Sequence, residues 1–270
     1  MKFGWIPDVP DVRDFDFRKM GKISKTLVGD SSIVGDLPIR VDLRENCSPV
    51  EDQGNLGSCT AQAVAGLVEY LERWAKSEYI DVSRLFLYKV TRKLYNLEGD
   101  TGAYLRGTMK ALRLFGACPE SYYPYDIKRF DDEPPAFCYA FAQNYQGLVY
   151  YRLDSSDVSR EDVLLRARSL LAKGVPFVFG FSVYSSIEQE IVTRTGEIPY
   201  PSSGDKLLGG HAVMAVGYDS SEKVFLIRNS WGNSWGDGGY GALPDEYFLT
   251  GLAEDFWCLL KLEYVSLKGL

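Results

Sequence analysis

The sequence predicts an α+β protein in which a helical half precedes a half rich in strands. Between residues 59 and 115, apolar residues recur at the i, i+3, i+4 spacing of amphipathic helices. After residue 175 the apolar segments become short, β-branched and aromatic, and turn residues separate them. Because helices and strands separated along the chain are typical of α+β folds, we expect a cleft where the two halves meet.

Capping and turn residues set the boundaries of the expected elements. Ser58 is the expected cap of the first helix, and Ser159 with Asp162 forms a capping pair at the last. Gly116 and Gly174 are helix stop signals. The expected helices span residues 59–76, 83–96, 103–115 and 160–173. The expected strands span residues 175–183, 211–217, 223–229 and 255–265.

The composition is that of a globular protein. The chain has 270 residues, of which 46% are hydrophobic and 25% charged, so it is long enough to bury a core. Its net charge of −7 argues against a nucleic-acid-binding surface, which needs clustered Lys and Arg. No apolar run approaches the roughly 18–20 residues of a membrane span. We therefore expect no nucleic-acid partner and no membrane partner.

Five cysteines and a single histidine limit the chemistry of any active site. One histidine excludes a His-rich metal site, and the scattered cysteines do not have the spacing of a zinc ribbon. Any imidazole base has to be His211. The N-terminus shows no apolar signal region, so the cytoplasm is the default expectation for the location of the protein.

Cys59 stands where a glycine-containing loop, residues 53–58, turns into the first expected helix. The unpaired N–H groups and the dipole of a helix N-terminus stabilise an anion, so the pKa of Cys59 is expected to be depressed. The alternative is a buried cysteine that only packs the start of the helix. This segment alone supports the two interpretations about equally.

His211 follows two glycines at the mouth of an expected strand. The glycines leave room around its ring and the strand fixes its position, as a general base requires, although a lone histidine is more often an ordinary core or surface residue. Residues 229–241 hold two Trp and five Gly. They form either a tight turn plugged by aromatic rings or a site in which Asn229 bonds His211 while Trp231 keeps water off that bond.

Three motifs follow one another along the chain: Gln-x5-Cys ending at Cys59, Gly-His-Ala-Val around His211, and Asn-Ser-Trp-Gly-x-x-Trp-Gly from Asn229. Together they resemble the papain-like cysteine proteases, peptidase family C1. The separation of Cys59 and His211 is close to the roughly 130–150 residues of that family. The resemblance covers about residues 38–265. It implies a two-lobed fold, with a helical N-terminal lobe, an antiparallel β-barrel-like C-terminal lobe and the active-site cleft between them.

The resemblance implies a cysteine endopeptidase that hydrolyses peptide bonds through a thioester acyl-enzyme. Protein or peptide substrates are expected, without a metal or cofactor. Cys59 is the implied nucleophile, His211 its base, Asn229 the group that orients His211, and Gln53 a donor of the oxyanion hole together with the Cys59 N–H. Trp231 is the implied shield of the Asn229–His211 contact. The implied substrate-binding residues are Ser58, Gly102, Ala103, Gly210 and Trp235.

Two departures from the family pattern concern a disulfide. Leu56 and Asp100 stand where the two cysteines of that bridge are expected, so both ends of the bridge are missing. Thr60 replaces the usual aromatic residue after the nucleophile. These differences resemble the bacterial or archaeal branch and fit a reducing compartment, while secretion with another bridge, such as Cys118–Cys138, stays open.

The resemblance divides the chain into an N-terminal extension (1–36), a helical lobe with the catalytic Cys (37–145) and a β-rich lobe with the catalytic His and Asn (146–270). The extension is expected to be an extended arm and not a core element. Because its aromatic residues seek a surface, we hypothesise that it covers the cleft and inhibits the enzyme intramolecularly. The alternative, an arm that only staples the two halves together, is equally well supported.

Two other functions are weighed against the protease. A Cys-His acyltransferase is disfavoured because Asn229 lies in the Asn-Ser-Trp-Gly motif. A catalytically silent or regulated papain-like peptide-binding protein is expected to have lost one of the reactive residues, and none is lost. The pocket for the second substrate side chain is expected around residues 252–256, where Glu254 and Asp255 favour basic side chains.

Overall fold

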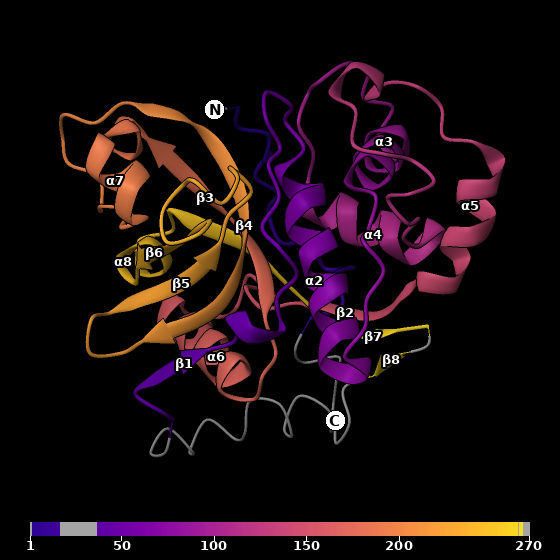
Figure 1. Ribbon diagram of the computed structural model, residues 1–270. Coiled ribbons are helices and arrows are strands. Elements are labelled where there is room, and N and C mark those ends of the chain that lie inside the picture. Colours follow the sequence, from indigo (N-terminus) through magenta and orange to yellow (C-terminus); the bar gives the residue numbers. More distant parts are fainter. Residues whose placement is uncertain (1, 17–36, 264, 267–270) are drawn as a thin grey trace.

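The structure, a computed structural model, describes residues 2–16, 37–263 and 265–266. Figure 1 shows a helical lobe beside a sheet lobe, with the N-terminal arm running between them. The α-helices are α2 (Cys59–Lys76), α3 (Arg84–Leu94), α4 (Leu105–Phe115), α5 (Ala136–Ala142), α6 (Arg160–Ala172), α7 (Glu190–Thr195) and α8 (Glu246–Leu249). The strands are β1 (Arg40–Asp42), β2 (Gly147–Arg152), β3 (Phe177–Tyr184), β4 (Leu207–Asp219), β5 (Val224–Arg228), β6 (Tyr240–Pro244), β7 (Ala253–Leu262) and β8 (Val265–Ser266).

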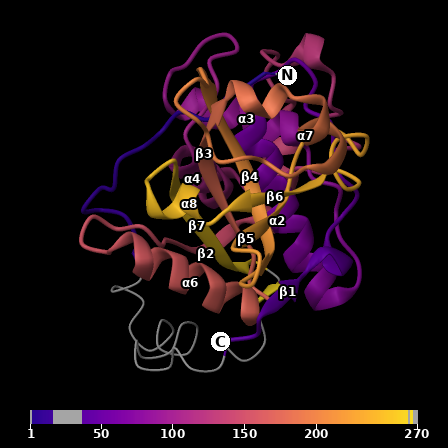
Figure 2. The same ribbon diagram turned by 90° about the vertical axis from the view of Figure 1, so that its left-hand side faces the viewer.

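The sheet is antiparallel and has the strand order β2-β7-β3-β4-β5-β6, with β1 paired to β4 and β8 to β7. Its central strand β4 carries His211, which lies opposite Phe181 of β3 in the register. Figure 2, in which this lobe faces the viewer, shows α6, α7 and α8 around the sheet and α2 behind it. The histidine is therefore held by pairing with β3, and further along β4 is paired on its other side with β5.

Helix α2 forms the seam between the lobes. Its apolar residues Val64, Leu67 and Leu71 are buried, as their helical spacing predicts. Ser58 occupies the expected N-cap position, but its side chain makes no capping hydrogen bond. That part of the expectation is wrong, because the Ser58 hydroxyl is instead 2.7 Å from the Tyr125 hydroxyl.

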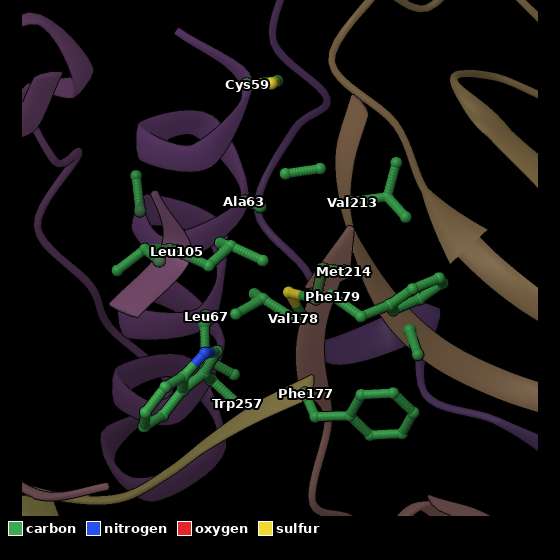
Figure 3. Close-up of a cluster of buried hydrophobic side chains, with 14 of the residues drawn as sticks. Cys59, Ala63, Leu67, Leu105, Phe177, Val178, Phe179, Val213, Met214 and Trp257 are labelled. Carbon is green, nitrogen blue, oxygen red and sulfur yellow. The ribbon is translucent and has the colours of Figure 1, made fainter. Parts of the chain in front are cut away.

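The core fills the space between α2 and the sheet. Figure 3 shows Cys59, Ala63 and Leu67 of α2 along one side of this cluster, with side chains of β3 and β4 opposite them. Behind the sheet, Phe256 stacks on Phe179 with their ring centroids 5.3 Å apart. Among the helices that the structure describes, none is long and apolar enough to cross a membrane.

The α+β, two-lobed prediction is confirmed, and each expected helix and strand is present with bounds that differ by a few residues. The short elements α5, α7, α8, β1, β2 and β6 were not predicted. A helix of six or seven residues is too short to show a helical period, and β6 contains Gly and Pro, which read as turn residues. The arm was expected to stay out of the core, but Trp5 is only 5% exposed and belongs to it.

The stability of the protein should depend on the aromatic packing of this core, and Phe256 offers a test of it. Phe256→Ala should lower the free energy of unfolding by about 3–5 kcal/mol, because a fully buried ring leaves a cavity. Phe137→Ala makes the same chemical change on a ring that is 54% exposed and should cost less than about 1 kcal/mol. Urea unfolding of the two variants measures the difference; equal midpoints would contradict the prediction.

Candidate active site

Cys59 is the first residue of α2 and is completely buried. The loop before it is tied to the sheet lobe through Gln53. The Gln53 N–H donates to the Ser230 carbonyl at 2.9 Å, and the Ser230 hydroxyl donates to Gln53 Oε1 at 2.7 Å. With Oε1 held in this way, the Gln53 side-chain amide presents its Nε2 donor toward the cleft, where it bonds the Leu56 and Lys2 carbonyls at 2.9 and 3.0 Å.

The imidazole of His211 is held by an amide and by aromatic rings. His211 Nε2 lies 2.8 Å from Asn229 Oδ1, and the Ser230 N–H donates to the same oxygen at 2.8 Å. The Ser230 donor fixes this atom as the oxygen of the amide, so Nε2 carries the proton in the neutral ring. His211 Nδ1 then is the basic nitrogen, and it has no hydrogen-bond partner among the described residues.

Trp231 covers the imidazole. Its ring stacks on His211 with the centroids 4.5 Å apart, and Phe181 meets His211 edge-on from the neighbouring strand. Trp235 stands at right angles to Trp231, with their centroids 5.2 Å apart. Both tryptophan rings are nearly buried, so they exclude water from the hydrogen bond between His211 and Asn229.

The N-terminal arm lies in the cleft. The Ala103 N–H donates to the Gly4 carbonyl at 2.7 Å, and the Ile6 N–H donates to the Ala103 carbonyl at 3.0 Å, so the arm runs parallel to this segment. The Trp5 N–H donates to the Gly210 carbonyl at 3.0 Å. Residues 4–6 therefore pair with both walls, one from each lobe (Figure 1).

Glycines make this close approach of backbone to backbone possible. A Cβ on Gly4 would overlap the Gly57 carbonyl, and a Cβ on Gly102 would overlap the Gly4 carbonyl. Gly102 also has a φ of 78°, in the region that favours glycine. The arm fits the cleft only because Gly4 has no side chain.

The Trp5 ring fills a pocket of the sheet lobe. A Cβ on Gly180 of β3 would overlap this ring, and the indole Nε1 donates to Asp255 Oδ2 at 3.1 Å. Asp255 also accepts from Trp257 Nε1 and lies 3.4 Å from the Arg152 guanidinium. Burial raises the pKa of the Asp255 carboxyl to about 7, and Arg152 and the indole donors lower it less.

Two further arm residues cover the reactive groups. The Phe3 ring meets His211 edge-on at 6.3 Å and Trp231 at 6.2 Å between centroids. The Lys2 carbonyl accepts the Gln53 Nε2 hydrogen bond described above, and the Lys2 ammonium pairs with Asp100. The arm thus places a carbonyl oxygen at the only side-chain amide of the candidate oxyanion hole.

Burial sets the protonation of the reactive pair in this state. Burial raises the pKa of the Cys59 thiol to about 11, while the N–H groups of Ala212, Gly4 and Thr60 lower it less. Burial lowers the pKa of His211 to about 4, and the bond to Asn229 raises it less. The expectation of a depressed Cys59 pKa is therefore wrong for this state, because the covered thiolate would lose its hydration. Both groups are neutral under the arm.

The structure brings all the candidate residues to one place. Gln53, Cys59, His211 and Asn229 surround the arm, whose backbone bonds Ala103 and Gly210. Tyr125, Tyr88 and Asp100 also contact the site, although no motif in the sequence predicts them as contacts. Tyr125 ends a Tyr-Pro-Tyr stretch, and its hydroxyl lies 2.7 Å from the Ser58 hydroxyl and donates to the Gln53 carbonyl at 3.0 Å.

Comparison with known proteins decides the family. A sequence model of the papain family cysteine proteases matches residues 37–255. The chain belongs to this family. An uncharacterized peptidase C1-like protein of Acanthamoeba polyphaga mimivirus is 36% identical over 96% of this chain and 87% of its own length. The thiol protease aleurain of Arabidopsis thaliana is 30% identical over 89% of this chain and 66% of its own length.

A solved structure of a cysteine protease supports the fold over most of the chain. Xylellain, a cysteine protease from Xylella fastidiosa, is 38% identical and superposes with a TM-score of 0.80. The match covers 95% of each chain. The resemblance to papain-like cysteine proteases is thereby confirmed.

Because Cys59 is buried, we expect it to be alkylated slowly. Adding one methyl group at Gly4 should make this alkylation faster. Gly4→Ala should expel the arm and speed the reaction of Cys59 with iodoacetamide at pH 8 by at least about tenfold, because a thiol with a pKa near 11 is roughly one part in a thousand thiolate there. The rate in the parent chain should keep rising above pH 9. Peptide mapping by mass spectrometry measures the rate at Cys59.

Gly204→Ala is the matched control, because a Cβ at Gly204 meets no atom within 4 Å. It should leave the rate at Cys59 unchanged. If Gly4→Ala reacts no faster than Gly204→Ala, the arm does not protect the thiol.

Proposed function

We propose that this papain-family protein is a cysteine endopeptidase, held latent by its own residues 1–36. The observation that carries the proposal is that three groups lie together at the arm. They are the Gln53 amide, which donates to the Lys2 carbonyl, Cys59 at the first residue of α2, and His211, whose Nδ1 has no hydrogen-bond partner among the described residues. These are the donor, nucleophile and base that acyl transfer needs. We assign the helical lobe to residues 37–145 and the β-rich lobe to residues 146–270.

In the proposed reaction, the arm leaves and water returns to the cleft. The desolvation that separates the pKa values of Cys59 and His211 then disappears, and the proton of the thiol passes to His211 Nδ1. Asn229 stabilises the imidazolium that forms, because its oxygen already accepts from Nε2. The result is a thiolate at the positive end of α2.

The thiolate attacks the carbonyl carbon of the scissile bond. The carbonyl oxygen becomes an oxyanion, and Gln53 Nε2 and the Cys59 N–H donate to it. The C–N bond breaks as the imidazolium gives its proton to the amine, which leaves a thioester on Cys59. A water, deprotonated by His211, then hydrolyses the thioester and restores the thiol. Trp231 excludes bulk water from the His211–Asn229 bond throughout.

Substrate backbone is proposed to replace the arm on the same walls. Ala103 offers both an N–H and a carbonyl, and Gly210 a carbonyl, all three now bonded to the arm. Gly102 and Ser58 line the same walls, and Trp235 faces the leaving-group side. A pocket beside it is lined by Asn55, Thr193 and Trp235 among other residues. Neither the acyltransferase nor the silent peptide-binding alternative is favoured by any of these contacts.

The arm is proposed to inhibit without being cut. The Gly4 N–H is among the groups that act on the Cys59 sulfur, so at this point the arm offers the thiol a hydrogen-bond donor and not an electrophilic carbon. Ion pairs hold the arm further along the chain: the Arg106 guanidinium contacts Asp14 at 2.7 Å and also contacts Asp8. The arm therefore has a charged anchor in addition to its Trp5 pocket.

The oxyanion role of Gln53 is tested in the Gly4→Ala background, where the cleft is open. Gln53→Ala should lower kcat for a fluorogenic peptide about 10²–10³-fold, since one oxyanion donor is lost. Gln143→Ala, at an exposed glutamine that follows α5 in the helical lobe, is the control and should leave kcat unchanged. Cys59→Ala should abolish cleavage; peptidase activity that persists without Cys59 would refute the mechanism.

The inhibitory role of the arm is tested through its anchor. Trp5→Ala in the full chain should raise peptidase activity, because the ring that fills the Gly180 pocket is lost. Deletion of residues 1–36 should raise the activity further. Phe15→Ala, at a half-exposed arm residue, should have little effect. Initial rates of peptide cleavage measure all three, and unchanged activity in a folded deletion variant would show that the arm only staples the lobes.

A further inference from the structure

We infer that Asp100 selects a basic side chain on the substrate residue that supplies the scissile carbonyl, and that the same carboxylate positions the loop before Cys59. The inference deepens the proposed peptidase function and rests on it. The two carboxylate oxygens of Asp100 have different partners. One oxygen faces the loop that carries the nucleophile, and the other faces the cleft.

The first oxygen ties two loops together. Asp100 Oδ1 accepts from the Gly57 N–H at 2.9 Å and from the Tyr88 hydroxyl at 2.6 Å. The Tyr88 oxygen in turn accepts from the Gly102 N–H at 3.1 Å. Gly57 lies two residues before Cys59, and Gly102 lies beside the Ala103 wall, so this network fixes the spacing between nucleophile and substrate wall.

The network takes the place of a covalent bridge. Leu56 and Asp100 stand where the resemblance to papain-like proteases places the two cysteines of a disulfide, and all five cysteines of this chain are free. The hydrogen bond from Gly57 to Asp100 connects the same two segments. A disulfide offers no charge to the cleft, whereas a carboxylate has a second oxygen and a negative charge.

The second oxygen already holds a cation. Asp100 Oδ2 pairs with the Lys2 ammonium, and the carbonyl of the same Lys2 accepts from Gln53 Nε2 at 3.0 Å. A residue whose carbonyl occupies the proposed oxyanion donor therefore has its lysine side chain within reach of Asp100. A substrate residue with its carbonyl at this donor can place a lysine or arginine side chain on the same oxygen.

Burial and charge around Asp100 favour this role. Its side chain is 14% exposed, so a cation that reaches it is partly desolvated and charge-assisted hydrogen bonding is stronger than on an open surface. The Lys2 side chain is 43% exposed, which leaves room beside the ammonium for the longer arginine. The nearby Arg92 is engaged by Asp131 at 2.7 Å and by the Gly99 and Phe130 carbonyls.

The test uses the full chain with Gly4→Ala and two peptides that differ at one side chain. They carry either lysine or norleucine, which share the same aliphatic stem, at the residue that supplies the scissile carbonyl. We expect kcat/KM to be about tenfold or more higher for lysine. Asp100→Asn keeps an oxygen for Gly57 and Tyr88 but removes the charge, so the lysine-to-norleucine ratio should fall toward one.

Glu133→Gln removes one negative charge from the surface, where Glu133 pairs with Lys93, and is the matched control. It should leave the ratio as it is. An unchanged ratio in Asp100→Asn, or a ratio near one in its parent, overturns the inference about specificity while the peptidase function stands.

The positioning role has its own readout, the pH profile of Cys59 alkylation. Asp100→Ala removes the acceptor of the Gly57 N–H and should shift this profile, whereas Asp100→Asn should restore it. If Ala and Asn give the same profile as aspartate, Asp100 does not position the loop.

A chain that cleaves neither peptide would refute the peptidase function. The specificity of Asp100 is then decided by the rates at which lysyl and norleucyl chloromethyl ketone peptides label Cys59. Labelling that favours lysine, and loses this preference in Asp100→Asn, supports the inference; equal labelling overturns it.

Discussion

The packing of α2 against the central strands of the sheet is the constraint on which the site depends. The helix carries Cys59 at its first residue, and the sheet carries His211 on β4. The Ala212 N–H acts on the Cys59 sulfur, so thiol and imidazole come from the two sides of one packed seam. Neither lobe contains a complete site, and the buried row in Figure 3 aligns the two halves. A change that lets the lobes slide disconnects nucleophile from base.

The arm lies along the same seam and covers the site that the two lobes form there. By pairing with Ala103 on one lobe and Gly210 on the other, it completes a continuous hydrogen-bonded layer where the lobes would otherwise be separated by water. The reactive pair is buried, which shifts the pKa values of Cys59 and His211 without any covalent bond between the arm and these groups. In the proposed latent state, control is exerted through solvation: a thiolate–imidazolium pair is unstable where both partners are desolvated, so the thiol and the imidazole stay neutral.

Much of the fold and of the candidate site was predictable from the sequence, and the features that were not predicted have physical causes. The helical spacing after Cys59 and the strand at His211 gave the lobes, because periodicity is strong in long elements. The Gln53, Cys59, His211 and Asn229 motifs predicted which residues meet. The arm's path was not predictable, since residues 2–6 have no period and their fit depends on a surface assembled from distant segments. The Cys59 pKa was misjudged for the same reason, as no local pattern shows what covers a thiol.

The absence of a side chain at Gly4 has a consequence for how readily this control can be lost. Glycine codons begin with GG and alanine codons with GC, so one nucleotide change at the second codon position adds the methyl group that the Gly57 carbonyl excludes. Under the proposed inhibitory role of the arm, a single base change is therefore enough to disturb its closest contact with the cleft.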